Sequence, residues 1–273
     1  MRYIKLSFKY LIKNILYLFL MSLIPAVLFG GLLSPFKFIE FINNYTSLTI
    51  VSFSNMFHAL IDVSWLKVLF YVICLGVLGL VVSIIIGAIE NHFRSGKKNY
   101  LKIKNYINNN LLVVLLNIIL IFVINFIVSF LCATLIYLFH IMFAGLNSSA
   151  NVGCVIVAII VFALYFCVMA IVSMTLLLNI PNMLINGYNF KQSISNTINV
   201  IGKNFINLLL AYILPYAVII PLISIFSFSS VAIHIVSGVC MVISIMYYSS
   251  FVMTAYFDLN NIMRYDNRKY YNI

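Results

Sequence analysis

The sequence alternates long apolar runs with short polar segments. Six apolar runs lie at residues 15–34, 65–89, 111–143, 152–178, 206–226 and 233–256. Each run is at least as long as the roughly 20 residues that an α-helix needs to cross a bilayer. This pattern predicts six membrane-spanning helices within a single integral membrane domain, residues 1–273.

One sequence unit occurs near both ends of the chain. A polar segment with helical periodicity leads to a Lys-Asn pair, and an apolar run with a proline at the same distance follows. The residues concerned are Lys13, Asn14 and Pro25 in the first copy and Lys203, Asn204 and Pro215 in the last. The polar segment is typical of a helix that lies in the headgroup region before the chain turns into the bilayer.

A weaker copy lies in the middle of the chain. Asn110 occupies the place of Asn14, but Ile121 stands where the proline would fall. We therefore predict an all-α, polytopic fold of three hairpin-like repeats, each led by an interfacial amphipathic helix. We expect the prolines to bend their helices, which requires that neighbouring helices or water satisfy the freed backbone groups.

The segment between the fourth and fifth spans, residues 179–205, is interrupted in its first half. Pro181 and Gly187 punctuate that half, whereas Ile194, Ile198 and Ile201 form an apolar stripe at helical spacing in the second half. This pattern predicts a turn that is followed by an amphipathic helix.

Composition places the chain among membrane proteins. Hydrophobic residues make up 64% of it and charged residues 8%, whereas soluble domains have roughly 45–50% and 25%. The net charge of +11 comes from short clusters between the apolar runs, and not from a basic patch on a soluble face. We therefore expect the lipid bilayer as a partner and no nucleic acid.

The positive charges also predict the orientation of the chain. All of the 16 Lys and Arg residues except Lys37 and Lys67 fall on one side of a six-span chain. Because segments rich in Lys and Arg stay in the cytoplasm, we expect a multi-pass protein with both termini cytoplasmic. The abundance of Asn, Ile, Lys and Tyr is typical of an AT-rich bacterium, so we predict a bacterial plasma membrane.

Few residues in the sequence are candidates for catalysis or ligand binding. The central parts of the six spans contain no Asp, Glu, Lys or Arg, and the sequence has no hydrolase, metalloprotease or nucleotide-binding motif. We predict no enzyme activity, no catalytic residue and no cofactor. Asn117, Asn125 and Ser129 share one face of the third span, where we favour hydrogen bonds between helices over a substrate path. Glu90 and Asp258 end the second and sixth spans as interfacial charges.

Three histidines and one aspartate are the one group of residues in the sequence that could bind a metal ion. His58, His140 and His234 all fall near the outer face of the six-span chain, and Asp62 follows His58 by four residues. Imidazole and carboxylate groups bind zinc, but this spacing matches no zinc motif. We favour separate interfacial histidines over a metal site.

Two stretches carry a resemblance to a known family: residues 181–215, PNMLINGYNFKQSISNTINVIGKNFINLLLAYILP, and residues 255–261, AYFDLNN. They resemble a large group of bacterial six-helix membrane proteins that includes the membrane domain of some glycerophosphoryl diester phosphodiesterases. The matching positions are Pro181, Gly187, Ser193, Lys203, Asn204, Tyr256, Phe257, Asp258 and Leu259. The resemblance implies six helices. It brings no enzymatic activity, because no phosphodiesterase domain is present in these residues.

These observations favour a non-enzymatic integral membrane protein, a scaffold or accessory subunit whose interfacial helices contact lipid headgroups or another membrane subunit. The alternative is the permease subunit of an ABC-type exporter or peptide self-protection system that works with a separate ATPase. That alternative needs a cytoplasmic docking helix, for which Glu90–Asn110 is the candidate segment.

Overall fold

The structure is a computed structural model that describes residues 2–32, 52–61, 65–98, 102–144, 150–226 and 229–266. These ranges contain helices and no β-strand, which confirms the all-α prediction. The α-helices are α1 (Arg2–Lys13), α2 (Ile15–Leu32), α4 (Phe53–Leu60), α5 (Trp65–Ser95), α6 (Ile103–Ala144), α7 (Ala150–Asn186), α8 (Phe190–Lys203), α9 (Phe205–Ile225) and α10 (Ser230–Leu259).

The long helices account for the predicted spans. Five of them, α5, α6, α7, α9 and α10, are each long and apolar enough to cross a membrane. Helices α1 and α2 pass the same test as one broken pair, bent by 92° at Asn14. The chain is therefore a polytopic, all-α membrane protein, whose described residues contain five spanning helices, or six when the bent pair counts as one span.

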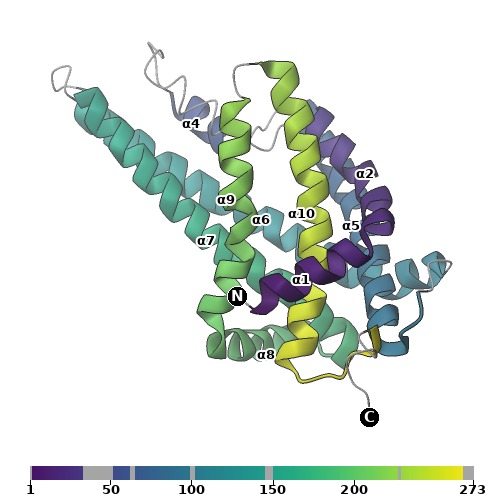
Figure 1. The fold of residues 1–273 in the computed structure, drawn as a ribbon. Coiled ribbons are helices and arrows are strands. Elements are labelled where there is room, and N and C mark those ends of the chain that lie inside the picture. Colours follow the sequence, from purple (N-terminus) through teal and green to yellow (C-terminus); the bar gives the residue numbers. More distant parts are fainter. Residues whose placement is uncertain are drawn as a thin grey trace.

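Helix α10 is the centre of the packing. It contacts α1, α2, α5, α7 and α9, and Figure 1 shows it standing among the other long helices. Its C-terminal half is buried, with Phe251, Met253 and Phe257 fully enclosed in the main apolar core. Ile85 of α5 and Leu208 of α9 belong to the same core.

Helices α5 and α6 approach each other closely along a row of small residues. Gly79, Ser83 and Gly87 follow each other at intervals of four on α5. The side-chain amide of Asn110 on α6 donates a hydrogen bond to the carbonyl oxygen of Ser83 at 3.2 Å. Tyr106 of α6 packs over Gly87. Small residues at this spacing let two membrane helices come together. The pattern of apolar runs did not predict this row.

The hairpin of α6 and α7 leans away from α9, towards the upper left in Figure 1. The two helices have 42 and 37 residues, which is more than a bilayer requires, and helices of such length tilt in the membrane or project beyond its hydrocarbon core. Their outward surfaces are apolar, with Leu112, Met142 and Leu164 among the most exposed side chains. Such surfaces fit contact with lipid.

The repeat unit has a clear structural counterpart in its two outer copies. Helix α1 ends at Lys13 and α2 begins at Ile15, while α8 ends at Lys203 and α9 begins at Phe205. The single residues between the helices are Asn14 and Asn204. In the first copy, the Asn14 side-chain amide donates to the carbonyl oxygen of Tyr10 at 2.9 Å and so caps α1.

The middle unit differs from the predicted pattern. Its lead-in and its span form one uninterrupted helix, α6, instead of an interfacial helix followed by a span. Asn110 is buried like Asn14, but its amide bonds to α5 and not to its own backbone. The helix thus continues through Asn110, whereas the chain breaks between two helices at Asn14 and at Asn204.

The prolines lie inside helices. Pro25, Pro181 and Pro215 are buried within α2, α7 and α9 respectively, and each of these helices continues beyond its proline.

Candidate functional site

Polar contacts and basic residues gather at one end of the bundle. Helices α1 and α8 lie across this end, near the C-terminal part of α10 (Figure 1). The C-terminal end of α5 and the N-terminal end of α6 lie at the same end. We call this region the polar end.

Helix α1 has one buried face and one exposed face. Tyr3, Ser7, Tyr10 and Leu11 are buried, at spacings that place them on one side of the helix. They pack against α10, and α1 also contacts α9 and α2. The charged side chains of the helix point the other way, so the helix meets the bundle with its uncharged side.

Three polar contacts hold α1 in place. The buried hydroxyl groups of Ser7 and Thr254 lie 2.9 Å apart. The phenol oxygen of Tyr10 lies 3.0 Å from Nδ1 of His92 on α5. At the start of α1, the guanidinium group of Arg2 forms an ion pair with the carboxylate of Asp258.

Helix α8 is attached to α7 by a network of polar side chains that we call the amide cluster. Its members come from α6, α7 and α8 and are Asn117, Asn179, Asn182, Asn186, Ser193, Asn196 and Thr197. Five of them, Asn117, Asn179, Asn182, Ser193 and Thr197, are buried. Because buried amides are costly when unpaired, their mutual bonding fixes the position of α8.

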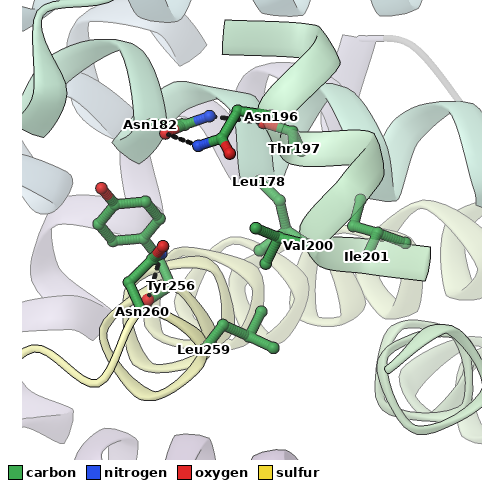
Figure 2. Close-up of a pocket in the computed structure, with 9 residues that line it drawn as sticks. All are labelled: Leu178, Asn182, Asn196, Thr197, Val200, Ile201, Tyr256, Leu259 and Asn260. Atoms are coloured by element: carbon green, nitrogen blue, oxygen red, sulfur yellow. Dashed lines mark hydrogen bonds between the residues drawn. The ribbon is translucent and has the colours of Figure 1, made fainter. Parts of the chain in front are cut away.

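Asn182 is the centre of the amide cluster. Its side-chain nitrogen donates to the carbonyl oxygen of Ser193 at 2.9 Å and to the hydroxyl of Thr197 at 3.0 Å. Its side-chain oxygen accepts from Asn186 at 2.7 Å and from Asn196 at 3.2 Å. One amide group thus connects α7 with three residues of α8, and Figure 2 shows the bond to Asn196.

A small pocket lies beside the amide cluster, between α7, α8 and the end of α10 (Figure 2). Its volume is about 10 Å³, which leaves room for about one water molecule. Its lining residues are Leu178, Asn182, Asn196, Thr197, Val200, Ile201, Tyr256, Leu259 and Asn260. The pocket is too small for an organic ligand, so the amide cluster has a structural role.

The predicted turn between the fourth and fifth spans is a short connection at Gly187. Helix α7 ends at Asn186, and Gly187 follows with a φ of 65°. Its N–H bonds to the carbonyl oxygen of Met183 at 3.0 Å. This left-handed conformation favours glycine, and it lets the chain reverse into α8.

Each acidic residue of the described chain lies at the polar end and is paired with an arginine. The pairs are Arg2 with Asp258, Arg94 with Glu90 at 3.0 Å, and Arg264 with Asp266 at 2.9 Å. The remaining exposed cations are Lys5, Lys13, Lys97, Lys98, Lys102, Lys104, Lys191 and Lys203. The surface of the polar end is therefore strongly positive.

Two of the three polar residues on the predicted third span, Asn117 and Asn125, bond to the neighbouring helix. Asn179 of α7 donates to the side-chain oxygen of Asn117 at 3.0 Å, and the hydroxyl of Tyr165 donates to Asn125. These contacts confirm hydrogen bonding between helices. Ser129 is buried on the same helix.

The histidines lie on three different helices, His58 on α4, His140 on α6 and His234 on α10, while Asp62 falls outside the described residues. Within the described ranges, no three His, Cys, Asp or Glu side chains come close enough to hold a metal ion.

A larger cavity lies between the long helices. Its volume is about 440 Å³, within the roughly 300–1,000 Å³ of small-molecule sites. Spanning helices α2, α5, α6, α7, α9 and α10 all contribute to its lining, and Leu60 of α4 adds to it. Tyr212, Tyr216 and Tyr248 bring hydroxyl groups into this mainly apolar lining. No sequence pattern singled out these tyrosines, because α9 and α10 are apolar on all sides and show no contrast between faces.

Comparisons with known proteins give no relative. No protein-family model matches the sequence, and no curated protein or solved structure is detectably similar to it. The function must therefore be argued from the geometry of this chain.

Proposed function

We propose that the protein is a non-enzymatic integral membrane scaffold or accessory subunit that attaches to anionic lipid headgroups through its polar end. The observation that carries this proposal is the position of α1 and α8. Both helices are fastened across the same end of the bundle by buried polar contacts, and both keep lysines exposed, such as Lys5 and Lys203.

Electrostatics supports this proposal. The carboxylates described at the polar end are already paired with arginines, so the exposed lysines give the surface its net charge. Each Lys or Arg near an anionic membrane surface contributes about 1 kcal/mol of attraction. Several such residues on two fixed helices hold the bundle at a defined depth, with the polar end at the cytoplasmic leaflet of a bacterial plasma membrane.

The test compares lipids of different charge. The purified protein in mild detergent receives either phosphatidylglycerol, which is anionic, or phosphatidylcholine, which is zwitterionic, and its thermal unfolding is followed. We expect phosphatidylglycerol to raise the Tm more than phosphatidylcholine does, and we expect salt to reduce the difference. Equal effects of the two lipids would contradict the proposal.

Charge variants show which lysines are responsible for the rise in Tm with phosphatidylglycerol. The triple variant Lys5→Gln, Lys13→Gln and Lys203→Gln removes cations from α1 and α8, whereas Lys67→Gln removes one near the start of α5, at the opposite end of that helix from Arg94. The triple variant should lose most of the response to phosphatidylglycerol and Lys67→Gln should keep it. A triple variant that responds like the wild type would place the lipid contact elsewhere.

A second candidate function, the permease subunit of an ABC-type exporter, is favoured by the cavity of about 440 Å³. The segment predicted to dock an ATPase, residues 90–110, supports this function less. In the described residues it forms no helix of its own, because 90–95 continue α5 and 103–110 belong to α6. Gentle purification from native membranes separates the two functions. A nucleotide-binding chain that co-purifies in stoichiometric amount supports the exporter, and its consistent absence supports the scaffold.

The family resemblance stays a prediction beside these proposals. A domain related to the membrane part of glycerophosphoryl diester phosphodiesterases would fit a non-catalytic role, since the resemblance covers membrane helices alone.

A further inference from the structure

The lining of the 440 Å³ cavity has two chemically different parts. Helices α5 and α6 contribute mainly hydrocarbon side chains such as Leu78 and Val82. Helices α9 and α10 add the phenol groups of Tyr212, Tyr216 and Tyr248. We propose that the cavity binds a neutral single-chain amphiphile. Its alkyl chain would lie against α5 and α6, and its uncharged headgroup would lie at the three tyrosines.

The three tyrosines form a compact group. Their ring centroids are 6.0 Å apart for Tyr212 and Tyr216, 4.9 Å for Tyr212 and Tyr248, and 6.1 Å for Tyr216 and Tyr248. The hydroxyl of Tyr248 donates to the backbone oxygen of Tyr212 at 2.8 Å, which fixes the orientation of its ring. Ser173 of α7 lines the same cavity.

These hydroxyl groups can serve a ligand. A phenol oxygen that donates its own hydrogen keeps lone pairs with which it accepts another. Tyr212 is almost fully buried, whereas Tyr216 and Tyr248 are partly exposed and line the cavity. A ligand hydroxyl or ester group placed here would thus meet fixed hydrogen-bonding partners.

The charge of the lining excludes several classes of ligand. No Asp, Glu, Lys, Arg or His is among the described residues that line the cavity. A phosphate or carboxylate would be buried in the membrane without a cation beside it, which is strongly unfavourable. A peptide chain would bring many backbone groups that this mainly hydrocarbon lining cannot satisfy.

The size and distribution of the polar groups favour one alkyl chain. The volume lies in the lower part of the range for small-molecule sites. The three tyrosines cluster in one part of the lining, and the polar side chains of Asn125 and Tyr165 elsewhere in it bond to each other. A ligand with a single polar headgroup therefore matches the lining. Monoacylglycerols and long-chain alcohols have this chemistry.

Photo-crosslinking tests the proposal on the full-length protein in mild detergent. The probe is a monoacylglycerol with a diazirine in its acyl chain, and excess unlabelled monoolein serves as competitor. Mass spectrometry of the digested protein locates the adducts. We expect adducts on cavity-lining segments of α5, α6 and α7, and we expect monoolein to suppress them at least fivefold.

A matched pair of variants on α5 distinguishes the cavity from the outer surface. Leu78 lines the cavity, whereas Leu80, two residues further on, is 38% exposed and does not line it. Leu78→Trp should reduce the competed labelling at least fivefold, and Leu80→Trp should leave it unchanged. Thermal unfolding verifies that both variants are folded.

A third variant tests the contact between the ligand headgroup and the tyrosines, and it leaves the size of the cavity almost unchanged. Tyr216→Phe removes one hydroxyl and should weaken competition by monoolein severalfold. Competition by hexadecane, which has no headgroup, should stay the same. This measurement stands even when Leu78→Trp does not fold.

Three results would overturn the proposal. The first is labelling confined to outward positions of α6 and α7. The second is competition by phosphatidylglycerol equal to that by monoolein, which would assign the site to charged bilayer lipids. The third is a Tyr216→Phe variant that binds monoolein as well as the wild type does.

Discussion

The phenol hydroxyl of Tyr247 donates a hydrogen bond to the carbonyl oxygen of Ala211 at 2.7 Å. Ala211 lies four residues before Pro215, so its carbonyl is the one that the proline, which has no N–H, leaves without its helical donor. Tyr247 is buried on α10 and thus supplies from a neighbouring helix the bond that α9 lacks. The contact meets the condition for a proline inside a membrane helix.

We predict that Tyr247→Phe lowers the free energy of unfolding by about 1–2 kcal/mol, because it leaves a buried carbonyl without this donor. In a Pro215→Ala background the new backbone N–H serves the same carbonyl, so the loss should be smaller. Unfolding by SDS in mixed micelles measures both values. Tyr188→Phe, at an exposed tyrosine, is the control. Equal losses in the two backgrounds would show that the two groups are not coupled.

The close approach of α5 and α6 yields a second prediction. A Cβ atom on Gly87 would lie 2.6 Å from the ring of Tyr106 and 2.7 Å from the amide of Asn110, whereas one on Gly76 would meet nothing within 4 Å. Gly87→Ala should therefore destabilise the protein by about 1–3 kcal/mol. Gly76→Ala should be neutral or stabilising by up to about 1 kcal/mol, because alanine favours the helix. Similar Tm values for the two variants would refute the close contact.

The amide cluster yields a third prediction, which concerns α8 alone. Asn182→Leu removes four hydrogen bonds of one side chain and should cost about 1–3 kcal/mol. Backbone amides of α8 should then exchange with deuterium faster than in the wild type, since its attachment to α7 is weakened. Asn199→Leu, on the exposed side of α8, is the matched control. Unchanged exchange in α8 after Asn182→Leu would argue against this attachment.

The sequence predicted the spans and the two outer repeat units because these depend on local properties. Apolar length determines whether a helix can cross the bilayer, and the Lys-Asn pairs mark the points at which α1 and α8 end. Helix ends were predicted less well. Helix α7 extends to Asn186, past the predicted end at 178, since a polar segment continues a helix when its side chains bond to neighbouring elements.

The buried faces could not be predicted from hydrophobicity. The apolar stripe of Ile194, Ile198 and Ile201 does not mark the side of α8 that packs against the bundle. Ile198 is 54% exposed, whereas Ser193 and Thr197 are buried with Ile201. In a membrane protein the lipid side is as apolar as the core, so apolar residues do not identify the interior. Small and polar residues do, as Ser83, Ser193 and Thr197 show. The tyrosines of the cavity depend on contacts between α9 and α10 that no local pattern encodes.

The proposed function requires that α1 and α8 lie at the cytoplasmic face of the membrane. Cysteine labelling in intact bacterial cells tests it, with Lys5→Cys, Lys203→Cys or Lys67→Cys introduced after the five native cysteines have been replaced. We predict that a membrane-impermeant maleimide labels position 67 in intact cells, and positions 5 and 203 only after the membrane has been opened. Labelling of position 203 in intact cells, at the same rate as position 67, would contradict both the orientation and the proposed attachment to the cytoplasmic leaflet.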